Sequence, residues 1–296
     1  MQGIIIVNQN VGHNQYKIDR LKEEAKQLDI CLGVFVNDGS LAIIKDNNIT
    51  INLPKADFVL YFDKDIYLAR LLDKAGYRLF NRPDFIKLCD DKMLTFIACS
   101  NKGIRMPTTM AGPLLYLDIK EENYKFLQQV ITQIGFPMVV KKVYGSLGEG
   151  VYLVHNQKEL KNLYKEIYRN PILFQQYIPS SYGSSIRVLV VNGRILGAFH
   201  RVNKDDFRSN YGENASSVPL EEEYREICYN FVNDIINKLN IEYAGIDLLL
   251  DQNQQPVLCE INSNAFFEEF EKVTKINVAK EILKMVIERT IKEKHE

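Results

Sequence analysis

The chain lacks the paired cysteines of a metal site or a disulfide framework. None of its five cysteines forms a CxxC pair, and most of them lie inside apolar runs. Because structural zinc and redox motifs need closely spaced thiols, buried and reduced cysteines fit this pattern better. We therefore expect neither a structural zinc ion nor disulfide bonds.

The sequence also lacks an excess of charge of one sign and any long apolar run. A formal net charge of −1 over 296 residues gives no reason to expect nucleic acid as a partner. No stretch reaches the ~18 apolar residues that a membrane span needs. The N-terminal "MQGIIIVNQN" has no basic region followed by a long apolar core, so it does not resemble a signal peptide. These absences predict a cytoplasmic protein that binds neither nucleic acid nor membrane.

The order of apolar runs predicts an α/β protein with several lobes. A chain of 296 residues is long for one core, since domains usually span ~100 to 200 residues. The first part alternates short β-branched runs with segments of helical periodicity, and later parts are richer in hairpins. We predict an N-terminal α/β domain over residues 1–88, a small α+β lobe over 89–172 and a C-terminal α+β lobe over 173–296.

Two carboxylates are predicted to face each other across the hairpin "AGIDLLLDQNQQPVLCEIN". If the hairpin turns at its most polar point, Asp247 lies opposite Glu260, and Asn262 points to the same face. Carboxylates this close repel unless a cation lies between them, and oxygen ligands suit Mg²⁺ or Mn²⁺. Alternatively, both acids lie on the solvent face of an exposed hairpin, and a slip of one residue in register would separate them.

A glycine-rich loop follows an apolar strand that ends in a lysine. Lys141 precedes "YGSLGEG", which holds Gly145, Gly148 and Gly150. Glycines let backbone N–H groups approach a phosphate, and a neighbouring lysine can neutralise its charge. The pattern is neither GxxxxGK[ST] nor a GxGxxG that opens a helix, which argues against a P-loop or a Rossmann site. The alternative is an ordinary hairpin turn.

A cluster of basic residues lies within residues 187–208. It contains five lysines or arginines and His200 against only two acids. The five are Arg187, Arg194, Arg201, Lys204 and Arg208. Arginine suits bidentate binding of carboxylate or phosphate. The alternative is a solvated face that pairs with acids elsewhere.

Taken together, these motifs resemble the ATP-grasp superfamily, and within it the carboxylate–amine ligases related to the ribosomal-protein-S6 glutamate ligase. The resemblance covers roughly residues 80–285, and its motifs follow the order of the family. They are "DDK", "FPMVVKKVYGSLGEGV", "LFQQYI", "IRVLVVNGRILGAFHR", "FRSN", "AGIDLLL" and "CEINSN". The resemblance implies an N-terminal pre-grasp domain followed by the two α+β lobes of an ATP-grasp fold.

The resemblance also implies a role for each matching residue. The implied nucleotide-binding residues are Lys92, Lys141, Ser146, Gly148, Gln176, Tyr177, Ile178, Ser185, Arg208 and Asn210. The implied ligands of two Mg²⁺ (or Mn²⁺) ions are Asp247, Glu260 and Asn262. The implied catalytic residues, which hold acyl-phosphate oxygens, phosphates or the acceptor carboxylate, are Arg187, Arg201 and Arg208.

The activity that the resemblance implies is an ATP-dependent ligation through an acyl phosphate. A carboxylate substrate and an amine substrate would form an amide, for example by addition of glutamate to a peptide, protein or small-molecule acceptor. Two alternatives stay open: an acyl-phosphate-forming or kinase-like enzyme that needs no amine, and a catalytically silent nucleotide-binding module. The oligomeric state also stays open, a homo-oligomer included.

Three departures from the family pattern concern the substrate. Ser185 stands where the ligase has an acidic residue for the ribose, and His200 replaces one arginine of a pair. The residues "SNAFF" at 263–267 follow Asn262 where the family has "SPG". We therefore expect a different pocket wall beside the implied metal ligands, and the identity of the acceptor does not transfer from the family.

Overall fold

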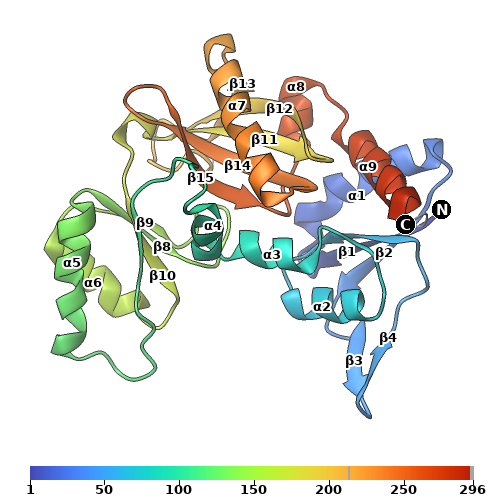
Figure 1. Ribbon diagram of the computed structural model, residues 1–296, viewed down its shortest axis with the longest axis horizontal. Coiled ribbons are helices and arrows are strands. Elements are labelled where there is room, and N and C mark those ends of the chain that lie inside the picture. Colours follow the sequence, from blue (N-terminus) through green and yellow to red (C-terminus); the bar gives the residue numbers. More distant parts are fainter. Residues whose placement is uncertain (213, 294–296) are drawn as a thin grey trace.

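A computed structural model of the chain describes residues 1–212 and 214–293. Sheets of four, four and five strands and a separate two-stranded hairpin hold the described strands. Figure 1 shows that the five-stranded sheet lies between the other two large sheets. In this described part, no helix is long and apolar enough to cross a membrane.

The N-terminal sheet is parallel, in the order β2-β1-β5-β6. Successive residues of β1 face opposite sides: Ile5 packs in one core with α1, and Ile4 packs in another with α2. Helices therefore cover both faces, as apolar strands of a parallel sheet require. The elements are β1 (Gln2–Asn8), η1 (Val11–Asn14), α1 (Gln15–Gln27), β2 (Cys31–Asn37), β5 (Phe58–Phe62), α2 (Ile66–Lys74) and β6 (Leu79–Phe80), with the hairpin β3 (Ala42–Lys45) and β4 (Asn48–Ile51).

Two short helices, α3 (Pro83–Asp90) and α4 (Lys92–Cys99), lead from this sheet to the next one (Figure 1). The carboxylate of Asp91 caps α4 by accepting a hydrogen bond from the backbone N–H of Leu94 at 3.0 Å. An aspartate at this position satisfies an N–H group that has no partner inside the helix. The cap makes Lys92 the first residue of α4.

The second sheet is antiparallel, in the order β7-β10-β8-β9. Met138 and Val140 of β8 face a core formed with α5 and α6, so the alternating residues Val139 and Lys141 face the other way. The elements are β7 (Thr109–Ala111), η2 (Glu121–Tyr124), α5 (Lys125–Ile134), β8 (Met138–Lys142), β9 (Val151–Val154), α6 (Gln157–Ile167) and β10 (Ile172–Gln176).

The third sheet is antiparallel, in the order β13-β12-β11-β14-β15, and α7 covers one of its faces. Val188 and Val190 of β11 pack toward α7. On the opposite face, Leu189 and Val191 join the core around α1 and α9. The elements are η3 (Pro179–Ser181), β11 (Ser184–Val191), β12 (Arg194–Val202), β13 (Ser216–Pro219), α7 (Glu222–Leu239), β14 (Tyr243–Leu250), β15 (Pro256–Asn262), α8 (Glu268–Thr274) and α9 (Val278–Glu293).

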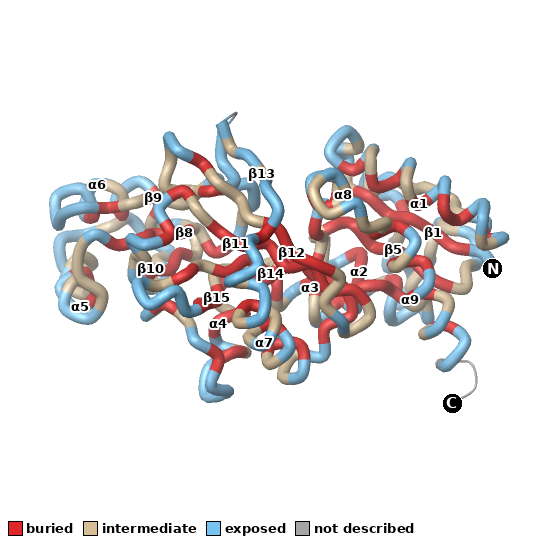
Figure 2. Tube along the Cα trace, turned by 90° about the horizontal axis from the view of Figure 1, so that it is seen from above, coloured by how far each residue is buried: buried red, intermediate tan, exposed pale blue. Residues whose placement is uncertain are grey.

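The last helix, α9, packs against α1, so a C-terminal helix lies beside an N-terminal one (Figure 1). Ile282 and Leu283 of α9 share a core with Ile18 and Leu21 of α1. The helix α9 ends at Glu293, and residues 294–296 lie outside the described residues. Figure 2 shows buried segments running through the middle of all three regions. The predicted α/β architecture with several sheets is confirmed, and the domain boundaries stay a proposal.

Candidate active site

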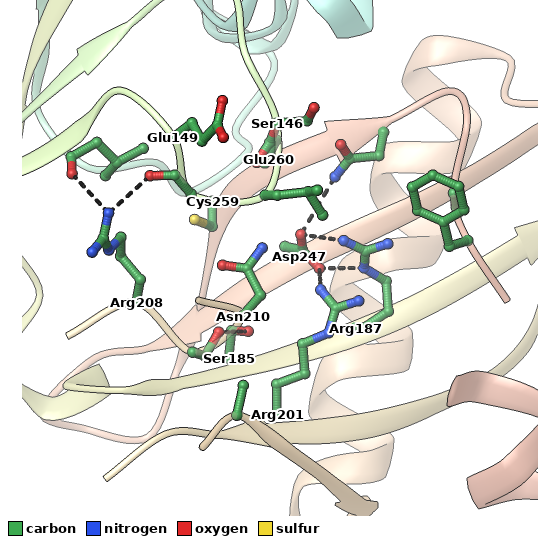
Figure 3. A pocket seen from close by; sticks show the side chains of 18 of the residues that line it. Ser146, Glu149, Ser185, Arg187, Arg201, Arg208, Asn210, Asp247, Cys259 and Glu260 are labelled. Atoms are coloured by element: carbon green, nitrogen blue, oxygen red, sulfur yellow. Dashed lines mark hydrogen bonds and ion pairs between the residues drawn. The ribbon is translucent and has the colours of Figure 1, made fainter. Parts of the chain in front are cut away.

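A cavity of about 680 Å³ is lined by residues from all three large sheets and from the N-terminal helices. Every residue that the sequence singled out as a ligand or catalytic residue lines it; Figure 3 shows part of the set. These residues are Lys92, Lys141, Ser146, Gly148, Gln176, Tyr177, Ile178, Ser185, Arg187, Arg201, Arg208, Asn210, Asp247, Glu260 and Asn262. Their individual roles stay predictions.

The acidic hairpin has the expected register at the cavity. Asp247 of β14 pairs with Glu260 of β15, and the two side chains lie on the cavity wall. Nearer the turn the register shifts, because Leu248 pairs with Leu258 and Cys259 is an extra residue. This β-bulge brings Cys259 to the cavity beside Glu260. The symmetric hairpin assumed from the sequence therefore holds only at the site, and the sequence did not predict the bulge.

Arginines neutralise Asp247. Arg187 forms a buried, bidentate ion pair with it, with an Nη2 to Oδ2 distance of 2.5 Å (Figure 3). Burial lowers the pKa of Arg187, but the charge of Asp247 and the hydrogen bonds to it together help to raise that pKa above its ordinary value. Asn262 donates a long hydrogen bond of 3.4 Å to the same carboxylate. Asp247 is thus held in one orientation by side chains of neighbouring strands.

Arg201 adds a second buried cation beside this pair. Its Nη1 lies 3.5 Å from Asp247 and its Nη2 lies 3.6 Å from Glu269 at the start of α8. Burial, and then the charge of Arg187, lower the pKa of Arg201. Two guanidinium groups therefore share mainly one buried carboxylate, and this surplus of positive charge favours an anionic ligand.

The predicted metal ligands form an oxygen-only set. Asp247, Glu260 and Asn262 come from two adjacent strands and contribute carboxylate and amide oxygens. Such donors fit Mg²⁺ or Mn²⁺ better than zinc. Over residues 1–212 and 214–293, no group of three or more His, Cys, Asp or Glu side chains is gathered as for a metal, because the third donor here is an amide. The set fits the implied ions.

Two buried lysines lie between this hairpin and the glycine loop. Lys141 extends from β8 on the face away from the α5 and α6 core. The ammonium of Lys92 lies 3.6 Å from Glu260 and donates a hydrogen bond to the carbonyl of Gly145 at 2.8 Å. Burial lowers the pKa of Lys92, and the charge of Glu260 opposes this effect. Both cations are placed where a phosphate chain would meet the loop.

The glycine loop contacts Arg208, which lies in the connection between β12 and β13. Gly145, Gly148 and Gly150 all have positive φ angles, which glycine adopts without strain. Arg208 donates a hydrogen bond to the carbonyl of Gly148 at 3.0 Å (Figure 3). Its guanidinium group also lies over the Tyr211 ring, 3.4 Å from the ring centroid. The loop thus covers one side of the cavity.

Residues of β10, β11 and the segments that follow β10 and β12 complete the predicted nucleotide site. The backbone N–H of Gln176 donates to the carbonyl of Thr108 at 2.8 Å, and Tyr177 and Ile178 follow it along the cavity wall. The hydroxyls of Ser185 and Ser209 are hydrogen-bonded at 2.6 Å. The predicted ribose position is therefore a serine pair, and the sequence reasoning missed its second member.

Both predictions for the basic cluster, anion binding and a solvated face, hold for part of it. Arg187, Arg201 and Arg208 line the cavity, whereas Arg194 and Lys204 are exposed and lie outside it. Only part of the cluster therefore serves the cavity, and the rest is a solvated surface.

The sequence reasoning missed the contribution that residues 8–17 of the N-terminal region make to the cavity. The cavity residues from this region are Asn8, Gly12, His13, Tyr16, Lys17 and Lys64. One signal existed: Lys17 precedes Leu21 by four positions, so it lies on the apolar stripe of α1 and is buried there. The segment 263–269 adds Asn264, Ala265, Phe266, Phe267, Glu268 and Glu269. The expected difference in the pocket wall thus lies at the cavity surface.

Comparisons with known proteins decide the family. A model of the RimK-like ATP-grasp domain matches residues 90–286. The chain belongs to the RimK-like ATP-grasp family. An uncharacterized protein of Mycoplasma pneumoniae is 31% identical over 278 residues, with 93% of this chain and 94% of that protein covered. Human N-acetylaspartylglutamate synthase A is 30% identical over 251 residues, with 83% and 61% covered. Beta-citrylglutamate synthase B of Danio rerio is 30% identical over 254 residues, with 82% and 60% covered.

Solved structures agree with the fold. A RimK domain ATP-grasp protein of Sphaerobacter thermophilus superposes with a TM-score of 0.70 at 18% identity, covering 97% of this chain and all (100%) of that one. The D-alanine–D-alanine ligase of Bacillus anthracis complexed with ATP gives a TM-score of 0.73 at 17% identity, covering 99% and 98%. The predicted fold class and the predicted membership among ATP-grasp ligases are confirmed.

Proposed function

We propose that this ATP-grasp ligase joins a carboxylate of one substrate to the amino group of another, an acidic amino acid such as glutamate, with release of ADP and phosphate. The observation that carries the proposal is the convergence of an oxygen-only ligand set and buried cations from separate sheets on one cavity. Two of the relatives are named beta-citrylglutamate synthase B and N-acetylaspartylglutamate synthase A, and the chain spans about 60% of their length.

Binding of ATP would use the residues around the glycine loop. Tyr177 and Ile178 follow β10 at the cavity wall, a place suited to the base. Lys92 and Lys141 are buried cations that can neutralise phosphate oxygens. Two Mg²⁺ ions held by Asp247, Glu260 and Asn262 would supply further charge neutralisation when bound.

The first step transfers the γ-phosphoryl group. A carboxylate oxygen of the substrate attacks the γ-phosphorus, the bond from that phosphorus to the bridging oxygen breaks, and ADP leaves with its electron pair. Arg187 and Arg201 offset the charge on the acyl phosphate, since both are buried beside a single main counter-charge. Such preorganised cations act without reorganisation at the moment of reaction.

In the second step the amine nitrogen attacks the acyl carbon, phosphate leaves, and the nitrogen loses a proton. Because water would compete with the amine, the intermediate needs cover. The glycine loop supplies this cover in the proposal, and Arg208 from the connection between β12 and β13 holds the carbonyl of Gly148. We also place the reaction in the cytoplasm, where ATP is available. Size-exclusion chromatography would determine the oligomeric state.

The test is release of ADP from the purified protein with ATP and Mg²⁺. L-glutamate would be supplied with citrate, with N-acetyl-L-aspartate or with a glutamate-terminated peptide, together and singly, and products would be identified by mass spectrometry. Turnover that needs both a carboxylate and an amine supports the proposal. Turnover with the carboxylate alone would indicate a kinase-like reaction, and nucleotide binding without turnover would indicate a silent module.

A further inference from the structure

One wall of the cavity carries a buried ammonium group that the proposed reaction does not use. Lys17 belongs to α1, in the N-terminal region, and only 2% of its surface is exposed. Its side chain nevertheless lines the cavity, together with Asn264 from the segment after β15. A charge at the border of core and cavity needs a partner, because removing it from water is costly.

The partners of Lys17 within the protein are neutral. Its ammonium donates a hydrogen bond to the side-chain oxygen of Asn264 at 2.5 Å. It also lies 4.2 Å from the ring centroid of Phe62 and 4.9 Å from that of Phe266. Asn264 in turn donates from its amide nitrogen to the backbone carbonyl of Phe62 at 2.9 Å, which directs its oxygen toward Lys17. The contact is thus built from both sides.

No carboxylate of residues 1–212 and 214–293 forms an ion pair with Lys17, although acids line the same part of the cavity. Those acids have other partners: Glu268 pairs with Lys272 at 2.6 Å, and Glu269 lies 3.6 Å from Arg201. Burial alone lowers the pKa of Lys17 to about 7. Lys17 is therefore a buried amine with no counter-charge among the described residues, and an anionic ligand would favour its protonated form.

We propose that Lys17 and Asn264 form a binding site for a substrate carboxylate that is not the one activated by ATP. This inference rests on the proposed function and adds to it the two residues that bind a substrate carboxylate outside the reacting groups. The carboxylate accepts a hydrogen bond from the ammonium, and Phe62 and Phe266 shield the pair from water. Asn264 lies two positions after Asn262, so the site borders the predicted metal ligands.

Binding measured by calorimetry in the presence of ADP and Mg²⁺ tests the site. The probes are L-glutamate, citrate and N-acetyl-L-aspartate, and the two monoamides of glutamate serve as controls that each lack one carboxylate. Lys17→Met should weaken binding of the affected carboxylate by about tenfold or more, the worth of a charge-assisted hydrogen bond. Lys17→Arg should restore most of it. Ile18→Val, which trims the neighbouring core residue of α1, should leave it unchanged.

Steady-state kinetics identify which substrate carries the carboxylate. Lys17→Met should raise the KM for that substrate and leave the KM for ATP and the kcat nearly unchanged. Asn264→Asp keeps the size of the side chain and places a carboxylate 2.5 Å from the ammonium in the position of the present oxygen. The new side-chain carboxylate should compete with the substrate carboxylate for Lys17 and so weaken substrate binding. This variant gives a second test if Lys17→Met does not fold.

Equal carboxylate binding by the wild type and by a folded Lys17→Met variant would overturn the site, and so would a wild type that binds none of the probes. The proposed function fails separately. A protein that binds carboxylates through Lys17 but releases no ADP with any substrate pair would retain this site and refute the ligase reaction.

Discussion

The two ends of the cavity treat buried positive charge differently. At the hairpin end, Arg187 is matched by Asp247 in a bidentate ion pair. At the N-terminal end, the ammonium of Lys17 contacts an amide and two aromatic rings, and it has no ion pair with any described residue. A paired cation is held in place before any ligand arrives, whereas an unpaired one gains its counter-charge from the ligand. The comparison suggests a preformed phosphate-transfer end and a ligand-completed recognition end.

The largest effect is expected from Glu260→Gln at the hairpin end. The change keeps the shape and removes the charge of a predicted metal ligand, so kcat for ADP release should fall about 100-fold or more. Thermal unfolding should show an intact fold. Glu166→Gln, an exposed change on α6 outside the cavity, is the matched control. Full activity of the Glu260 variant would refute the metal assignment.

Lys141→Met tests whether the preformed end serves the nucleotide. Loss of one charge-assisted contact should weaken ATP binding by about 10- to 100-fold, measured by calorimetry with Mg²⁺ present. Lys142→Met is the control, because the neighbouring lysine of β8 does not line the cavity. Similar losses in both variants would indicate a general electrostatic effect and not a phosphate contact.

Arg201→Ala tests whether Arg201, near the hairpin end of the cavity, contacts the substrate or ATP. We expect the KM for the carboxylate or amine substrate to rise about tenfold, or kcat to fall comparably, with ATP affinity nearly unchanged. Arg194→Ala removes an exposed arginine of the same strand as a control. An equal loss of ATP affinity would instead indicate that Arg201 contacts the phosphates of ATP and not the carboxylate or amine substrate.

The smallest effect is expected from Cys259→Ala. Burial raises the pKa of this thiol, so it stays protonated near neutral pH and is a poor metal ligand. The value of kcat/KM should therefore change by no more than about twofold. A large loss in ADP release would show that the bulge residue takes part in the preformed end.

The hairpin end was predictable because its geometry is local in sequence. Asp247 and Glu260 face each other through a short turn, and strand alternation adds Asn262 to the same side. The bulge at Cys259 was not predictable, because one extra residue leaves no mark on the apolar pattern. The contact between Lys17 and Asn264 joins positions 247 residues apart. Its one signal in the sequence is that Lys17 lies on the apolar face of α1.

The sequence by itself determined the elements, the faces of the strands and the motifs of the family, because all three depend on short-range periodicity and on residue type. Tertiary structure decided which charges are paired and how the face of β11 divides between core and cavity. Leu189 is covered by the core around α9 and α1, while Arg187 on the same face remains at the cavity. That division depends on how distant segments pack, since burial of a side chain is a property of its neighbours in space.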